Sequence, residues 1–392
     1  MKTVYLDYSA TTPVDPRVVE VMLPFWNSTY GNPSSVHRFG REARFALEEA
    51  RERIARAIGA SPAELVFTSG GTESNNYALK GVAQQALKSG KNHIIISAIE
   101  HHSVLEPAES LREIGCDVEI LPVDSDGLLD PESVRRALKP TTALVSAMHA
   151  NNEIGTIQPI KEIVEIAHAK GVAVHTDAVQ TLGKVPVRAD ELGVDLLSIT
   201  AHKIYGPKGV GAIYIRKGTN IDALLQGGTQ ESNRRAGTEN VAFAVGFAKA
   251  VELCAGFESE QSRIGELKER LRQLLLAEFD GILVNGHPTR SLNGILNISF
   301  DSKVTEIDGD ALIMGMDLRG VAVTSGSACT SGSLQPSHVL LALGRDHKTA
   351  RASIRFSMGR WTTDEDIAYA VEALREVVAH ARKRRTSVAK TV

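Results

Sequence analysis

Short apolar runs alternate along the first two thirds of the chain with longer segments in which apolar residues recur at helical spacing. The short runs predict strands at residues 65–67, 93–97, 118–121, 143–148, 172–175 and 196–199. The periodic segments predict helices at residues 34–58, 104–114, 131–138 and 160–170. Because strands that alternate with helices form βαβ units, we predict an α/β fold with a mainly parallel sheet buried on both faces.

The pattern changes after about residue 257. Residues 258–279 form one long charged amphipathic segment, which predicts a helix, and short strands are predicted at residues 294–300, 321–324 and 353–356. Helical spacing returns near the end of the chain. This mixture predicts a second, smaller α+β domain.

The composition is that of an ordinary globular protein. Of the 392 residues, 43% are hydrophobic and 23% are charged, and the formal net charge is −3. A nucleic-acid-binding protein would carry a basic excess, so we expect a small-molecule partner and no direct nucleic-acid binding. Residues 320–344 carry no Lys, Arg, Asp or Glu, but they are too rich in Ser, Thr and Gly for a membrane span.

Three cysteines, at positions 116, 254 and 329, are too few and too scattered for a disulfide framework. The sequence contains no Cys-x-x-Cys pair for zinc or dithiol chemistry. Residues 1–7 lack a basic segment followed by an apolar one, so we expect no signal peptide. These features predict a cytoplasmic protein without a resident metal.

Polar side chains follow five of the predicted strands. They lie at residues 68–75, 100–102, 151–153, 177–180 and 200–203. The carboxyl ends of parallel strands lie at the same edge of a sheet, and ligands of open α/β sheets bind there. Five polar strand ends together therefore predict a ligand-binding or catalytic site.

The first of these strand ends offers a candidate phosphate site. Gly70 and Gly71 precede Thr72, which opens a predicted helix, and a helix N-terminus has free N–H groups and a positive dipole end. The residues match neither a dinucleotide fingerprint nor a Walker loop. Taken alone, a glycine-rich turn is more often only a turn.

Asp177 and Lys203 each end an apolar strand, where an unpaired charge is costly to bury. The two residues alone favour equally a simple ion pair and a reactive lysine, since a desolvated lysine amine forms Schiff bases with carbonyl compounds. Together with a phosphate turn, they point to pyridoxal 5'-phosphate, whose pyridine nitrogen is held by an acid and whose aldehyde is held by a lysine.

A set of motifs then resembles the cysteine desulfurases of the NifS/IscS type, in the class V aminotransferase group. In order from Tyr5 to about Trp361, these motifs are LDYSATT (6–12), GNPSS (31–35), GTESN (71–75), EH (100–101), NNEIG (151–155), HTDAVQ (175–180), AHK (201–203), RRAGTEN (234–240) and SGSACTSG (325–332). The resemblance implies a homodimer with the fold-type-I architecture of pyridoxal-phosphate enzymes. The large domain of that fold contains a mainly parallel sheet, typically of seven strands. In that fold the N-terminal residues pack with the small domain. We therefore expect a large cofactor domain at 15–257 and a small α+β domain made of 1–14 and 258–392.

The resemblance also implies residue roles, carried over by position. Lys203 resembles the lysine that bonds to the cofactor, and Asp177 resembles the partner of the pyridine nitrogen. Gln180 matches the contact to the ring oxygen, and Asn152 matches another ring contact. His101 resembles the residue that stacks on the cofactor, and we choose it over the neighbouring His102.

Further positions match the ligands of the cofactor phosphate and of the substrate. Gly71, Thr72, Thr200 and His202 match phosphate-binding positions, and Thr238 resembles a phosphate ligand from the second subunit. Asn32 and Arg355 resemble the pair that binds the substrate carboxylate, which suits the bidentate guanidinium of Arg. Residues 7–9 stand where some members carry two asparagines after the Asp; we expect this segment to lie near the site without being central to its chemistry.

Cys329 decides the reaction class. It lies in residues 324–333, a run of small residues that predicts an exposed mobile loop, whereas Cys116 and Cys254 are expected to be inert core residues. With the resemblance, this predicts that L-cysteine gives L-alanine, that Lys203 or His101 moves the α-proton, and that Cys329 receives the sulfur as a persulfide. An acceptor protein would then take the sulfur for iron–sulfur cluster assembly or other sulfur biosynthesis, and Cys329 could transiently ligate such a cluster.

Three alternatives remain at this stage. A selenocysteine lyase or a class V transaminase would use the same cofactor site, although a transaminase needs a 2-oxo acid and has no use for Cys329. A catalytically silent scaffold for cluster assembly would not need Lys203, Asp177 and Cys329 together.

Overall fold

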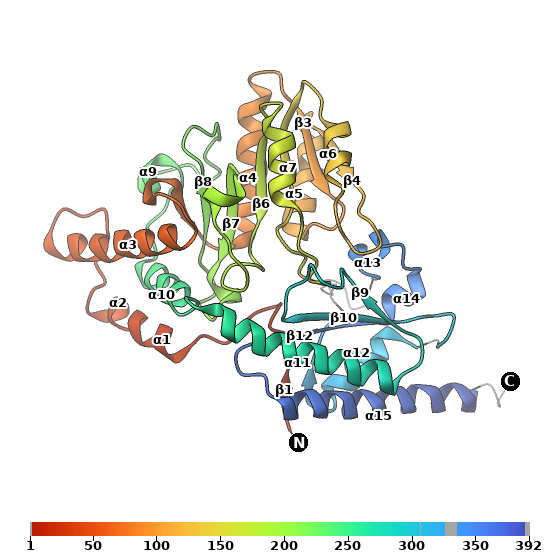
Figure 1. Ribbon diagram of the computed structural model, residues 1–392. Coiled ribbons are helices and arrows are strands. Elements are labelled where there is room, and N and C mark those ends of the chain that lie inside the picture. The colour runs from red at the N-terminus through yellow and green to blue at the C-terminus, as the bar shows by residue number, and fades with distance from the viewer. Residues whose placement is uncertain (1, 306, 326–334, 389–392) are drawn as a thin grey trace.

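A seven-stranded sheet forms the centre of the larger part of the molecule (Figure 1). The computed structural model describes residues 2–305, 307–325 and 335–388, with side chains as far as residue 381. The strands, in the order β2-β8-β7-β6-β5-β3-β4, are β2 (Leu65–Thr68), β8 (Gly211–Ile215), β7 (Leu196–Thr200), β6 (Ala173–Asp177), β5 (Thr142–Ser146), β3 (His93–Ser97) and β4 (Asp117–Leu121). Strand β8 pairs antiparallel with both neighbours and the other pairs are parallel. The predicted α/β fold with a mainly parallel sheet is confirmed.

Helices cover both faces of this sheet. Along β2, Leu65 and Phe67 point to one apolar cluster while Val66 points to another, as the alternation of a strand requires. The first cluster includes helices α1 (Pro16–Met22), α3 (Arg38–Ala57), α6 (Pro131–Ala137), α7 (Ile160–His168) and α10 (Val241–Glu252). The second includes α4 (Gly71–Leu87) and α5 (His102–Arg112). Polar side chains within the sheet bond to one another, as His175 does to Ser146 and Ser198, so the polar groups open to a ligand lie at the strand ends.

Element ends differ from the prediction where caps intervene. The helix predicted from residue 34 begins at Arg38, because the Nδ1 of His37 accepts a hydrogen bond from the Gly40 amide at 3.3 Å. Helix α10 ends at Glu252, so Cys254 lies just after this helix. Cys116 is buried as expected, while Cys254 is partly buried. Burial raises the pKa of both thiols, that of Cys254 to about 11.

The smaller part of the molecule is built around two short sheets. An antiparallel sheet has the order β12-β10-β9, and β1 pairs parallel with β11. The elements are β1 (Val4–Tyr5), α11 (Phe257–Glu278), β9 (Ile282–Asn285), β10 (Ile295–Phe300), α12 (Gly309–Asp317), β11 (Val321–Ala322), α13 (His338–Ala342), α14 (His347–Arg351), β12 (Ser353–Ser357) and α15 (Asp364–Val388). The predicted α+β character is therefore present in this part.

One face of the antiparallel sheet is apolar and the other is polar, yet both are buried. Ile298 and Phe356 belong to an apolar cluster with α11, α12 and α15. Asn297, Ser299 and Arg355 alternate with them and point the other way, each with less than a tenth of its surface exposed. The polar face carries Arg355 to the edge of the large sheet.

The apolar residues gather in separate clusters. Val4 and Leu6 join residues between 264 and 378 in the cluster of the small part, whereas the largest cluster runs from Val18 to Val251. This separation supports the division into residues 15–257 and residues 1–14 with 258–392, which stays a proposal. Within the described residues, no helix is long and apolar enough to cross a membrane.

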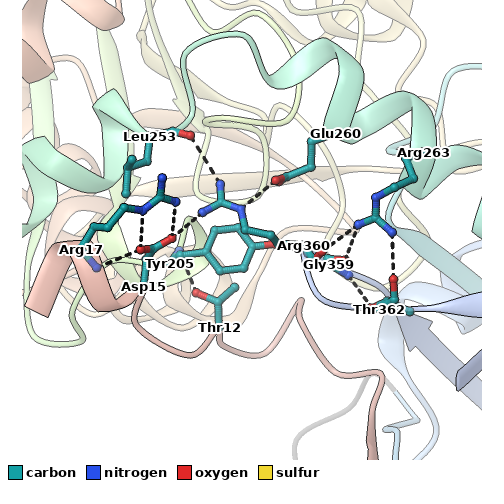
Figure 2. Close-up of polar contacts among 10 residues, drawn as sticks. All are labelled: Thr12, Asp15, Arg17, Tyr205, Leu253, Glu260, Arg263, Gly359, Arg360 and Thr362. Atoms are coloured by element: carbon teal, nitrogen blue, oxygen red, sulfur yellow. Dashed lines mark hydrogen bonds and ion pairs between the residues drawn. The ribbon is translucent and has the colours of Figure 1, made fainter.

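Arg360 joins the two parts (Figure 2). Its guanidinium bonds to Asp15 at 2.9 Å and to Glu260 at 2.7 Å, and it lies over the ring of Tyr205, 4.2 Å from the centroid. Its backbone N–H also donates to the hydroxyl oxygen of Tyr205 at 2.6 Å. Asp15 is held from the other side by Arg17. One side chain thus connects the N-terminal segment, the start of α11 and the loop before α15.

We predict that Arg360→Met lowers the free energy of unfolding by about 3 kcal/mol, because the carboxylate of Glu260 loses its partner in a partly buried site. Urea-induced unfolding measures the change. Arg375→Met is the control, since Arg375 pairs with Glu278 on the exposed surface, where solvent screens the ion pair, and the change in stability should be much smaller. Equal effects of the two variants would contradict a structural role for Arg360.

Candidate functional site

A cavity of about 320 Å³ lies at the carboxyl ends of the parallel strands. Its wall contains residues from all five polar strand ends, together with residues from the N-terminal segment and from β12; they include Ser9, Thr72, His101, Asn152, Asp177, Lys203 and Arg355. The fold therefore brings together side chains that lie up to about 350 positions apart in the sequence, as expected for an open α/β sheet.

Helix α4 begins at the rim of this cavity. Gly70 has a φ of +155°, and a Cβ on Gly71 would meet the Cγ2 of Val179 at 2.6 Å, so only glycine lets the turn approach the segment after β6 this closely. The amides of the first helical turn have no acceptor within the helix, and Thr72 lines the cavity beside them. These donors and the helix dipole suit a phosphate group.

Asp177 carries a buried carboxylate held by neutral donors. Its Oδ2 accepts from Asn75 Nδ2 at 2.7 Å, and its Oδ1 accepts from the Val179 amide at 2.9 Å. Because a buried carboxylate favours a cationic partner, and Asp177 lines the cavity, the arrangement suits a ligand with a protonated ring nitrogen.

Lys203 presents its amine in the same cavity. Its Nζ donates to the carbonyl oxygens of Ser9 at 2.5 Å and Ala10 at 2.7 Å, so the simple ion pair with Asp177 that the sequence left open is not formed between these two residues. Burial, and then the charges of Lys184 and Arg355, lower the pKa of Lys203 to about 7. An amine with this pKa is largely available as a nucleophile or base near neutral pH.

Two neighbours of Lys203 were expected at the phosphate. The Oγ1 of Thr200 donates to the Val210 carbonyl oxygen at 3.0 Å, which commits its proton within the chain. The Nδ1 of His202 lies 3.2 Å from the Thr11 hydroxyl, and burial lowers the pKa of His202 to about 4, so the imidazole is neutral at pH 7. Both residues line the cavity.

His101, and not His102, lines the cavity. The Nδ1 of His101 accepts from the Ser103 amide at 3.0 Å, which caps helix α5 and fixes the ring. Burial lowers the pKa of His101. The His102 ring is exposed and lies 3.6 Å from the Glu106 carboxylate.

Arg355 lies where a substrate carboxylate could bind. Its Nη1 donates to the Asn152 carbonyl oxygen at 3.0 Å, and its Nη2 donates to Asp7 at 2.7 Å. Its Nε is buried and has no partner among the described residues. A buried unpaired donor beside the cavity calls for an anionic acceptor.

Three residues of the expected site lie elsewhere or outside the described chain. Asn32 is exposed, its Oδ1 accepts from the Ser34 amide, and it does not line this cavity, so its pairing with Arg355 stays a prediction. Thr238 lines a separate cavity beside Ser69, so the described chain does not bring it to its own Lys203. Cys329 falls outside the described residues.

Sequence reasoning missed the backbone and the supporting side chains. Ser9 and Ala10 contact the reactive amine directly, which corrects the expectation that this segment is not central to the chemistry. Asn75 holds both Asp177 and Ser103 and leaves its buried Oδ1 unpaired among the described residues. The signal for Asn75 was present, since a polar side chain on the buried face of a helix needs a partner.

Comparisons with known proteins agree with this geometry. The aminotransferase class-V family model matches residues 4–369. The cysteine desulfurase IscS of Dictyoglomus turgidum is 51% identical over 382 residues, which cover 97% of this chain and 96% of that protein. A solved NifS-like protein has a TM-score of 0.90 at 39% identity, covering 97% of this chain and 100% of the other. A structure of SspA in complex with cysteine has a TM-score of 0.81 at 36% identity, covering 92% and 100%.

We predict that the Lys203 amine titrates with a midpoint near pH 7 in the ligand-free protein, because burial and neighbouring cations disfavour its charged form. The rate of acetylation of Lys203 by a dilute anhydride, followed by mass spectrometry of its peptide, should rise through this midpoint and level off above it. Exposed lysines in the same sample serve as the control. A midpoint near the ordinary value of about 10.4 would contradict the depressed pKa.

Proposed function

The chain belongs to the aminotransferase class-V family, and from that premise we propose how its residues divide the work of a cysteine desulfurase. The activity is the removal of sulfur from L-cysteine with pyridoxal 5'-phosphate as cofactor, in line with near-full-length relatives that carry this name. The observation that carries the proposed roles is the Lys203 amine, whose pKa is lowered to about 7 in a cavity that also holds Asp177 and the start of α4.

The donor set of the cavity fits this cofactor. The N-terminal amides of α4, with Gly71, Thr72, Thr200 and His202, would hold the phosphate, and Asp177 would hold the ring nitrogen in its protonated form. When bound, the cofactor supplies an aldehyde carbon and an electron-withdrawing ring that stabilises negative charge at the α-carbon of the substrate.

Three further side chains would orient the ring. His101, whose imidazole is fixed by Ser103, would cover its face, and Asn152 would contact its edge. Gln180 would donate to the ring oxygen, because its carboxamide has a second N–H beyond the one given to the Ser9 carbonyl oxygen.

Arg355 would bind the substrate carboxylate. Its unpaired Nε–H and its remaining Nη–H groups can donate two hydrogen bonds to one carboxylate, while Asp7 and Asn152 hold the guanidinium in place. This orients the α-proton of the substrate toward the Lys203 side of the cavity. The neutral Nζ of Lys203 then takes up that proton and later returns one to the product.

Cys329 would receive the sulfur. Its thiolate forms a bond to the sulfur of the substrate as the carbon–sulfur bond breaks, the electron pair stays on the carbon, and protonation of that carbon gives alanine. The support for Cys329 comes from the sequence, where it stands in a run of small residues, and from the raised pKa of the other two thiols, which disfavours their thiolates.

We predict that Cys329→Ser lowers the rate of alanine release from L-cysteine at least about 100-fold, because no thiolate remains to attack the sulfur. Mass spectrometry after incubation with L-cysteine should find one added sulfur on the parent chain, on the peptide of residue 329, and none on the variant. Cys116→Ala is the matched control and should keep both the rate and the added sulfur. Alanine release at the parental rate by Cys329→Ser would rule out this role.

We further propose a homodimer in which Thr238 of one chain contacts the phosphate bound by the other. Large apolar side chains exposed between residues 23 and 45 support pairing; these are Leu23, Trp26, Tyr30, Val36, Phe39 and Phe45. Exposed apolar patches of this kind are typical of protein–protein interfaces. The segment before Thr238 is anchored on α4 by the Arg235–Glu73 ion pair, so it is well placed to act beyond its own chain.

We predict that Phe45→Asp converts the dimer into a monomer and weakens cofactor binding, because a charge would be buried in the interface. Light scattering after size-exclusion chromatography measures the mass. Leu318→Asp is the control, since Leu318 is as exposed as Phe45, at 72%, but lies after α12 in the small part. Dissociation by both variants, or by neither, would contradict this interface.

Location and sulfur acceptor complete the proposal. Free thiols at Cys116 and Cys254 suit a reducing compartment, and we propose the cytoplasm. The acceptor would be a protein of iron–sulfur cluster assembly or another sulfur pathway, as suggested by the IscS name of several relatives.

A further inference from the structure

A second lysine lies behind Lys203. Lys184 follows strand β6 in the chain, and its Nζ donates to the Oε1 of Gln180 at 3.2 Å. Lys184 and Lys203 line the same enclosed cavity of about 20 Å³, together with Ser9 and Cys254. Lys184 does not line the larger cavity, so it approaches the reactive amine from the side away from the substrate.

Lys184 determines which way the Gln180 carboxamide points. An ammonium group only donates hydrogen bonds, so the Gln180 oxygen must face Lys184 and its nitrogen must face away. The Gln180 Nε2 then donates to the Ser9 carbonyl oxygen at 2.9 Å, the same atom that receives Lys203 Nζ. The second Nε2 proton remains for an acceptor in the larger cavity, which Gln180 lines.

Lys184 also acts on Lys203 through its charge. Burial lowers the pKa of Lys184 to about 8, so the side chain is mainly protonated at pH 7. After burial, Lys184 is the largest cause of the lowered pKa of Lys203; Arg355 acts in the same direction, and Asp177 and Asp7 act against it. Arg355 disfavours the charged form of Lys184, whereas the Cys254 thiol, with a pKa of about 11, is uncharged at pH 7. Glu260 and Tyr205 also line the shared cavity.

We propose that Lys184 is a positioning residue of the desulfurase, which orients the Gln180 carboxamide toward the cofactor and places a positive charge beside the Lys203 amine. Both effects reach the chemistry through another residue. The proposal rests on the roles proposed above for Lys203 and Gln180.

The first test compares Lys184→Met, which removes charge and donor, with Lys184→Arg, which keeps both. In the cofactor-free protein, Lys184→Met should raise the acetylation midpoint of Lys203 by about one pH unit. Recombination with pyridoxal phosphate needs the neutral amine and should be about tenfold slower at about pH 6 and unchanged at high pH. Lys184→Arg should stay close to the parent in both measurements.

Lys268→Met is the matched control. Lys268 is another buried lysine with its pKa lowered to about 8, but it donates to Ser291 and to the Leu292 carbonyl in the small part. Its loss should leave the Lys203 midpoint and the recombination rate unchanged. If the acetylation midpoint of Lys203 were the same in Lys184→Met as in Lys268→Met, the proposed effect of the Lys184 charge would be disproved.

A double-mutant cycle tests the effect on Gln180. Gln180→Ala should weaken equilibrium binding of pyridoxal phosphate at pH 7, where Lys184 is still mainly protonated, measured in a Lys203→Ala background so that the Lys203 amine plays no part. Adding Lys184→Met to Gln180→Ala should then weaken binding no further. If the two losses multiplied instead, Lys184 would not act through Gln180.

Two variants keep the outcome clear. If Lys184→Met did not fold, Lys184→Gln, which retains a donor without the charge, would be measured in the same way, and an unshifted midpoint there would equally reject the charge effect. Lys203→Ala tests the underlying function separately. Covalent retention of pyridoxal phosphate by Lys203→Ala would refute the proposed role of Lys203, whatever Lys184→Met does.

Discussion

Burying the amine of Lys203 disfavours its charged form, and much of the site is arranged around that constraint. The carbonyl oxygens of Ser9 and Ala10 hold the amine by hydrogen bonds without adding a negative charge that would restore its proton. The carboxylate of Asp177 is kept for another partner by Asn75 and by the Val179 amide. One cavity therefore contains an amine with a lowered pKa and a carboxyl group without an ion pair between them, and such an amine supports proton transfer near pH 7.

The carbonyls that hold Lys203 belong to a segment that is itself fixed at both ends. Before Ser9, strand β1 pairs with β11, and Asp7 bonds to Arg355, so this end is part of the small domain proposed here. After Ala10, Asp15 receives Arg360 from the loop before α15 (Figure 2). The reactive amine of the large sheet and the substrate-binding arginine of the small sheet are thus connected through a few residues of one extended segment.

Sequence patterns were sufficient for the sheet and for the side chains that follow its strands. Asp177 and Lys203 could be found because a charged residue at the end of an apolar strand needs an explanation. The hydrogen bonds of Ser9 could not, because every residue has a carbonyl oxygen and the contact joins positions 194 apart. The pairing of Asn32 with Arg355 stays a prediction, since a motif match gives no distance and the described chain does not bring Asn32 to this cavity. The match to Cys329 lies outside the described residues and remains a prediction.

The polar face of the small sheet has a consequence for how substrate recognition is specified. Arg355 lies opposite Asn297 in the ladder between β12 and β10, while Ile354 and Phe356 lie in the apolar core. A slip of β12 by a single residue would exchange these faces, sending the guanidinium into the core and a phenyl ring into the cavity. The register between β12 and β10 therefore decides whether a cationic or an apolar side chain faces the cavity, and so whether the site can bind an anionic ligand. Local disturbance of strand pairing would abolish recognition of a carboxylate even if every cavity side chain were retained.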